Sequence, residues 1–335
     1  METDRRTFLA AAGGLAASAA LPMDAFASSA RRAAPVLPWE EIAPGVVAFV
    51  VGPTGGNVIA AKTDGATVVV DTKFPYLAAA IRDDAVAHGG DNLDLLVINT
   101  HHHADHTGGN LAFAGRYPVY AHERGVKRVR DQFDRYVQGA RAGVKQAVDL
   151  MESGQLDADV RKSAEAAAER AERLEPHNFV PTHPVGVPLT QLRRVGVDMH
   201  HFGPGHTDND LVVHLPDRNV VHCGDLVFRG LHPFFDANAG TDPFGWIASL
   251  WRIYQLCDSD TVVVPGHGAV GDRTMVRDMI RYHERLIESV TADIDAGVSR
   301  DDATKKTYDW MEGIGFAQLR PIAIGVVYDE VTKRR

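Results

Sequence analysis

The feature that most constrains this chain is a cluster of proton-binding residues placed directly after an apolar run. Residues 95–99 read LLVIN, and residues 100–109 read THHHADHTGG. The apolar run predicts a buried strand. Side chains two apart in an extended segment point to the same side, so His101 and His103 would share a face that His102 does not. Imidazole and carboxylate donors suit zinc and similar metals, and the segment therefore indicates a metal site.

Three other strand ends supply matching donors. His206 lies in GPGHTDND, Asp225 in HCGD and His267 in PGHG, and glycines beside them permit close backbone approach. Coincidence is a poor explanation for so many metal-donor residues at four strand ends. The candidate metal ligands are His101, His103, Asp105, His106, His206, Asp225 and His267.

The four motifs, in this order and with these gaps, resemble the metallo-β-lactamase superfamily between about residues 40 and 270. The resemblance implies an α+β fold, an αββα metallo-β-lactamase-like sandwich with its metal site at one edge of two sheets. The strand pattern alone supports only a mixed α/β protein.

The resemblance also implies roles for the ligands and a cofactor of two zinc ions, with iron or manganese as alternatives. Asp225 would bridge the two metals, and a hydroxide between them would be the nucleophile. Asp105 would also be catalytic, by orienting that hydroxide or moving a proton to the leaving group. The first metal would be held by His101, His103 and His206, and the second by Asp105, His106 and His267.

Runs of β-branched residues predict the strands, and apolar periodicity predicts the helices. Between the two strand-rich halves, residues 123–174 are charged, almost free of Gly and Pro, and carry one apolar stripe that stops at Gly154. We expect a helical hairpin inserted into a single domain spanning 36–335. Strands are expected at 46–51, 57–62, 67–71, 95–99, 211–215, 219–225 and 261–268, and helices at 76–88, 243–256 and 272–295.

The N-terminus differs from the rest of the chain. Residues 1–30 contain Arg5 and Arg6, a mild apolar run rich in Ala and Gly, and small residues near Ala27. This pattern resembles a twin-arginine signal peptide, with cleavage after Ala27 or Ala30, and the alternative is an amphipathic or membrane-anchoring helix. We therefore expect a periplasmic or secreted protein without a stable membrane span after cleavage.

The net charge of −9, from 35 basic and 44 acidic residues, argues against a nucleic-acid partner and leaves a small-molecule substrate as the expectation. The oligomeric state cannot be predicted from the sequence. The only two cysteines, Cys223 and Cys257, are expected to be separate buried thiols, although a bridge after export is an alternative.

Several residues near the motifs are expected to have other roles. His102, His122 and His222 are interpreted as structural residues or as residues that support the ligands from behind, and His232 is a candidate for the pocket. The insert and residues 226–245 are expected to shape that pocket. Its candidate apolar walls, which could equally be ordinary core residues, are Phe228, Phe234, Phe235 and Trp246.

Together these features predict an exported metal-dependent hydrolase of a small ester, lactone, thioester or amide. β-Lactam hydrolysis, as a main or promiscuous activity, is an alternative; lactamases of the resembling family usually have cysteine or serine near the place of Asp225. Two further alternatives are a mononuclear iron sulfur dioxygenase and a non-catalytic metal or redox accessory protein.

Overall fold

The computed structural model describes residues 37–335, apart from 51–54, 91–93, 155–158, 174 and 187. The expected signal segment, residues 1–30, lies outside the described residues. Everything below belongs to the unit Pro35–Arg335.

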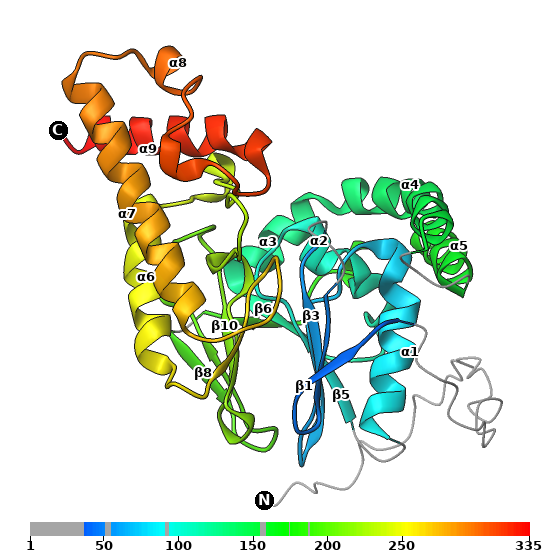
Figure 1. Ribbon diagram of the computed structural model, residues 1–335. Helices are drawn as coiled ribbons and strands as arrows, with labels where there is room; N and C mark the ends of the chain where they lie inside the picture. Colours follow the sequence, from blue (N-terminus) through cyan, green and yellow to red (C-terminus); the bar gives the residue numbers. More distant parts are fainter. Residues whose placement is uncertain (1–36, 51–54, 91–93, 155–158, 174, 187) are drawn as a thin grey trace, which may run out of the picture. The chain divides into compact units, whose positions relative to one another are not determined.

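The first sheet has seven strands in chain order, β1 to β7 (Figure 1). Strands β1 to β4 pair antiparallel, whereas β4 to β7 pair parallel. All of β4 and most of β5 are buried, which is why their sequences are continuous apolar runs. The strands are β1 Glu40–Ala43, β2 Val46–Phe49, β3 Val58–Lys62, β4 Ala66–Val70, β5 Asp94–Ile98, β6 Val119–His122 and β7 His183–Val185.

The second sheet has five strands in the order β12-β11-β10-β9-β8. Val68 and Ile98 of the first sheet share one apolar core with Val213 and Val264 of the second, so the two sheets pack face to face. The strands are β8 Leu189–Leu192, β9 Val197–His200, β10 Val212–Leu215, β11 Val220–His222 and β12 Val262–Val264.

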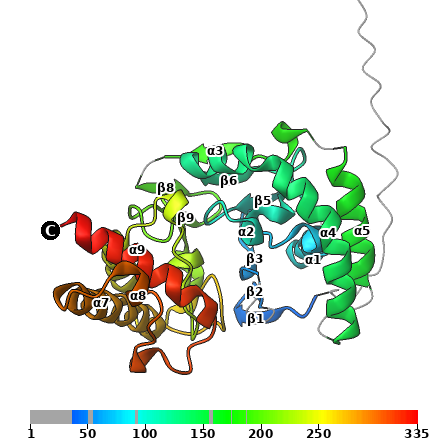
Figure 2. The ribbon, with the colours of Figure 1, turned by 90° about the horizontal axis from the view of Figure 1, so that it is seen from above.

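Helices cover the outer faces of both sheets. Helix α1 (Ala78–Gly89) packs on the first sheet, and α6 (Pro243–Leu256) and α7 (Thr274–Asp295) pack on the second, with α9 (Arg320–Lys333) against α7 (Figures 1 and 2). Two short helices complete this set, α2 (Ala104–Thr107) and α8 (Arg300–Ala303). The expected αββα architecture is confirmed.

The described residues of the segment 123–174 form three helices, where a hairpin of two was expected. Helices α3 (Glu123–Asp131) and α4 (Phe133–Glu152) are separated by Gln132 alone, and α5 (Asp159–Ala171) follows. A one-residue break leaves the three- and four-residue spacing of the apolar side chains almost intact, so the break could not be predicted from that periodicity. Gly154, with φ +73°, follows the end of α4 as expected.

Two further expectations concern the chain as a whole. No helix in the described part of the chain combines the length and the apolar character needed to cross a membrane. Cys223 and Cys257 are both free thiols buried in the core beneath α6 and α7, as expected.

Candidate metal centre

The structure brings all seven candidate ligands together at one edge of the two sheets. His101 and His103 follow β5, and Asp105 and His106 lie on α2, whereas the second sheet contributes the rest. His206 comes from the loop before β10, Asp225 follows β11 and His267 follows β12. The donors could form two metal-binding groups, His101, His103, His206 and Asp225 in one, and Asp105, His106 and His267 in the other.

In the first group, Nδ1 of His103 lies 3.0 Å from Nε2 of His101 and 3.0 Å from Nε2 of His206. Oδ2 of Asp225 lies 3.4 Å from Nε2 of His206. In the second group, Oδ2 of Asp105 lies 3.3 Å from Nε2 of His267. These distances place the donor atoms of each group around a common point.

Asp225 lies between the groups. Its Oδ1 is 3.1 Å from Nε2 of His106, and its Oδ2 is 3.3 Å from Nε2 of His267 as well as facing the first group. The side chain is 4% exposed and comes from a short turn, Gly224–Leu226 (η5), whose Gly224 has φ +52°. A carboxylate in this position can reach both groups.

Hydrogen bonds on the far side of four of the five imidazoles determine which nitrogen faces the centre. Nδ1 of His106 lies 2.7 Å from Oδ2 of Asp71, and Nδ1 of His206 lies 2.8 Å from the carbonyl of Phe234, so both nitrogens donate. Nε2 of His103 likewise donates to Asp236, at 2.9 Å. The opposite nitrogen of each ring is therefore an unprotonated donor for a metal.

Nδ1 of His101 is also a hydrogen-bond donor, in this case to a hydroxyl group. The Thr100 hydroxyl donates to Oδ2 of Asp71 at 2.7 Å, so it accepts from Nδ1 of His101 at 3.1 Å. The inward nitrogens of His101, His103 and His206 then hold no hydrogen to share, although Nδ1 of His103 lies 3.0 Å from each of the other two. Only a cation satisfies such a cluster, and the donor set fits a first-row metal.

Two buried atoms support the same fit. Nε2 of His106 and Oδ1 of Asp225 have no hydrogen-bond partner, although both face the second group. Burial lowers the pKa of His206 to about 3 and holds that of His101 well below its usual value. Burial would raise the pKa of Asp225, but the imidazoles of His267 and His106 hold it well below its usual value. His101, His206 and Asp225 are thus in the protonation states that bind metals. Burial would lower the pKa of His106 and of His267, but the Asp225 carboxylate raises both, that of His267 to about 9, so these two imidazoles would release a proton when a metal binds.

Sequence reasoning missed the two carboxylates that orient the histidines, Asp71 and Asp236. Asp71 ends the run TVVVD with φ +62°, so a polar residue at a strand end was the available signal. Asp236 lies 133 positions from His103, and no sequence pattern joins them.

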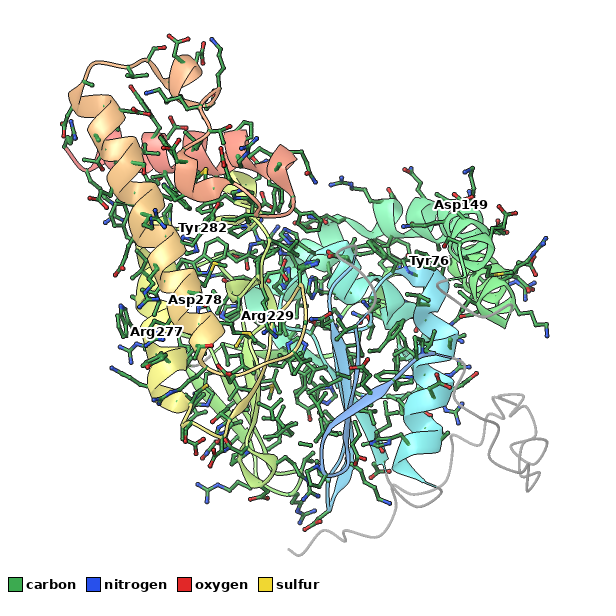
Figure 3. The ribbon with its side chains drawn as sticks, in the orientation of Figure 1. Tyr76, Asp149, Arg229, Arg277, Asp278 and Tyr282 are labelled. Atoms are coloured by element: carbon green, nitrogen blue, oxygen red, sulfur yellow. The ribbon has the colours of Figure 1, made fainter. Side chains whose placement is uncertain are left out.

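The other histidines make hydrogen bonds away from the cluster centre. Nδ1 of His102 lies 3.2 Å from the Asn209 amide, Nδ1 of His122 accepts from the start of α3, and Nε2 of His222 lies 3.2 Å from the carbonyl of Asn57. The expectation for His232 was wrong. It is fully buried and its Nδ1 lies 2.7 Å from the hydroxyl of Tyr282, on α7 (Figure 3), because its loop turns inward under that helix.

A cavity of ≈ 820 Å³ opens over the donors. The insert contributes Gln132, Arg135 and Tyr136, and a C-terminal segment that sequence analysis did not single out contributes Phe316. Of the four expected walls, Phe228 and Phe234 line the cavity, whereas Phe235 and Trp246 are buried in the core. Arg135 is the only lysine or arginine among its described lining residues.

The helical insert packs closely against the segment beside the cavity. A Cβ atom on Gly143 of α4 would lie 2.8 Å from Cδ1 of Tyr76, so glycine lets the helix approach the segment before α1 (Figure 3 labels Tyr76). The hydroxyl of Tyr136 donates to the carbonyl of His102 at 2.7 Å. The insert is thus attached directly to the histidine-rich loop.

Two stacked sheets between helical layers, with buried imidazoles and carboxylates at one edge, define a metal-binding protein of mixed α/β architecture. The model of the Metallo-beta-lactamase superfamily matches residues 51–267. The chain therefore belongs to the metallo-beta-lactamase superfamily, as the motifs indicated.

Similar proteins agree with this placement. "Metallo-beta-lactamase type 2" from Bacillus cereus is 31% identical over 80 residues, which are 24% of this chain and 31% of that protein. The solved structure of TMB-1 has a TM-score of 0.52 at 18% identity, covering 75% of this chain and 99% of that one. The metallo-beta-lactamase FIM-1 from Pseudomonas aeruginosa, in a mono-zinc form, has a TM-score of 0.52 at 16% identity over 76% of this chain and 97% of that one. At these identities the structures show the shared fold.

Proposed function

We propose that this protein is a metal-dependent hydrolase with a dinuclear site, acting on a small ester, lactone, thioester or amide. The observation that carries the proposal is the position of Asp225, whose two oxygens face two separate groups of donors. The first metal would be held by His101, His103 and His206, the second by Asp105, His106 and His267, with Asp225 shared.

Zinc, iron or manganese bound here would supply Lewis acidity and lower the pKa of water. The protein contributes buried imidazoles that hydrogen bonds hold in fixed orientations. Asp105 lines the cavity with 23% of its side chain exposed, and its carboxylate would accept a proton there. The anchored imidazoles need no reorganisation when substrate binds.

The cavity supports a small substrate that is partly apolar and carries an anionic group. Phe74, Phe228, Phe234 and Phe316 supply aromatic walls around the donors. Arg135 extends from α4 at the rim and presents a guanidinium group that matches a carboxylate. A carbonyl compound with a nearby carboxylate fits both features.

A cyclic amide is a second candidate, because the similar proteins named above include metallo-beta-lactamases. A mononuclear iron oxidoreductase is a third candidate, since the first donor group alone has four donors.

The test is metal content per chain followed by turnover of lactone, thioester, phosphodiester and cephalosporin substrates. Two metals at the seven-residue centre with hydrolysis of one carbonyl class would support the proposal, and cephalosporin turnover alone would favour the second candidate. One iron with oxygen consumption and no hydrolysis would overturn it.

We also propose export to the periplasm or medium by a twin-arginine route. The proposal rests on Arg5, Arg6 and the small residues around Ala27. Replacing both arginines with lysine should keep the folded protein in the cytoplasm, and unchanged export would contradict it.

A further inference from the structure

A further group of metal donors, separate from the first and second groups at the strand ends, lies on the outer face of the second sheet. Strands β9 and β10 pair antiparallel, with His214 opposite Asp198 and Val212 opposite His200. Because side chains alternate along a strand, Asp198 and His200 lie on one face, and the cross-strand pairing puts His214 on the same face. The intervening residues, such as Met199 and Val213, point into the core between the sheets.

The donors of this group are close together and belong to partly exposed side chains. One ligand atom from each of Asp198, His200 and His214 lies within 4.8 Å of the others, and all three side chains are partly exposed. Nε2 of His200 is buried without a hydrogen-bond partner. The side-chain amide of Gln191 donates to Oδ1 of Asp198 at 3.0 Å and does not donate to Oδ2 of the same carboxylate.

The protonation states also suit a metal. Burial, followed by the neighbouring His214, lowers the pKa of His200 below its ordinary value, and burial lowers that of His214. Two neutral imidazoles beside a carboxylate form no strong ion pair, so charge attraction does not explain why they gather. Phe202 stacks on His200 with ring centroids 5.2 Å apart, which limits the orientation of that imidazole.

We propose that Asp198, His200 and His214 bind one divalent first-row transition-metal ion, with zinc as the best match, separately from the centre at the strand ends. Two histidines and one carboxylate on a rigid strand pair leave positions for water, as in other sites of this composition. The ion would link β9 to β10, and the partial exposure of the donor side chains would allow the ion to exchange with solution.

The test uses the full chain saturated with zinc and compares metal content with that of His200→Gln, His214→Gln and Asp198→Asn. Each variant should hold one equivalent fewer than the parent while hydrolysis is unchanged. His183→Gln is the matched control, because His183 is an exposed sheet histidine outside every donor group, and it should hold the parent number.

The readout is the difference in metal content between each variant and the parent, because this difference does not depend on how many ions the strand-end centre holds. Added zinc should also raise the melting temperature of the metal-depleted parent more than that of the three variants. Equal metal content in the parent and all three folded variants, or equal zinc-induced shifts, would overturn the proposal.

Discussion

The carboxylate of Asp71 holds His106 and Thr100 in one arrangement. Its Oδ2 accepts from Nδ1 of His106 at 2.7 Å and from the Thr100 hydroxyl at 2.7 Å, while its Oδ1 accepts from the Thr100 amide at 2.8 Å. Through Thr100 the same carboxylate also determines the orientation of His101. One residue that faces neither donor group thus orients an imidazole in each.

Asp71→Asn should therefore weaken metal binding about 10–100-fold, because asparagine has one acceptor oxygen where Asp71 uses two, and the three donors from His106 and Thr100 cannot all be satisfied. Competition with a zinc chelator would measure the affinity. Asp84→Asn is the matched control, since buried Asp84 accepts from Leu37 and Trp39 far from the donors. The control should lose stability and keep its metal affinity; equal affinities in the two variants would contradict the role of Asp71.

Asp225→Asn should lower the metal content of the strand-end centre towards one ion and remove most of the hydrolytic activity. The reason is that a neutral amide does not attract two cations at once. Elemental analysis measures the content. His102→Ala should keep the full content, because Nδ1 of His102 faces Asn209. An unchanged content in Asp225→Asn would argue against a shared carboxylate.

Phe316 combines a strained backbone with a place in the cavity. Its φ is +60°, and backbone bonds of its neighbour Gly315, to His232 at 2.8 Å and to Gly230 at 3.0 Å, hold the segment there. Phe316→Gly and Phe316→Ala should both raise KM, since both lose the ring. Gly should be the more stable variant by about 1 kcal/mol, because alanine keeps the strain. Denaturant unfolding would compare them, and a more stable alanine variant would contradict the strain.

Arg135→Gln should raise KM for substrates that carry a carboxylate roughly 10-fold or more, because a charged hydrogen bond contributes about 1.5–3 kcal/mol. KM for the corresponding neutral substrates should be unchanged. Arg130→Gln, an exposed position on α3 outside the cavity lining, serves as the control. Equal effects on both substrate types would show that Arg135 does not select charge.

His283 makes stability depend on pH. Burial lowers its pKa to about 3, and neither ring nitrogen has a hydrogen-bond partner. The ordinary value is 6.5, so between pH 6.5 and 3 the unfolded chain binds a proton there that the folded chain does not, and stability falls as pH falls.

His283→Leu should remove this contribution. Relative to the parent, the variant should gain about 1.4 kcal/mol of unfolding free energy per pH unit below 6.5, or about 2 kcal/mol by pH 5. Urea unfolding at pH 7 and pH 5 would measure it. A difference between variant and parent that does not change with pH would mean that His283 does not titrate in this way.

Elements with uninterrupted local signals could be predicted from the sequence. Helix α6 begins and ends at the residues expected for it, and β4 and β5 were visible as runs of Val, Leu and Ile. The seven donors stood out because each follows or precedes a strand within a glycine-rich turn.

What the sequence did not reveal depends on packing between distant segments. Strands β8 and β9 mix polar and apolar residues because one face is partly exposed, so no continuous apolar run marks them. The contacts of Asp236 with His103 and of His232 with Tyr282 join residues far apart in the chain. Local periodicity carries no information about such pairs.

The donors of the strand-end centre are divided between two halves of the chain. His101, His103, Asp105 and His106 come from the first sheet and its connections, while His206, Asp225 and His267 come from the second. Asn57 joins the halves again, because its side-chain amide donates to the carbonyls of Pro265 and Gly268 on either side of His267. Neither half contains a complete ligand set, so high-affinity metal capture must be a late event in folding. A chelator present during refolding should then slow the final docking of the halves while leaving the early collapse of each sheet unchanged.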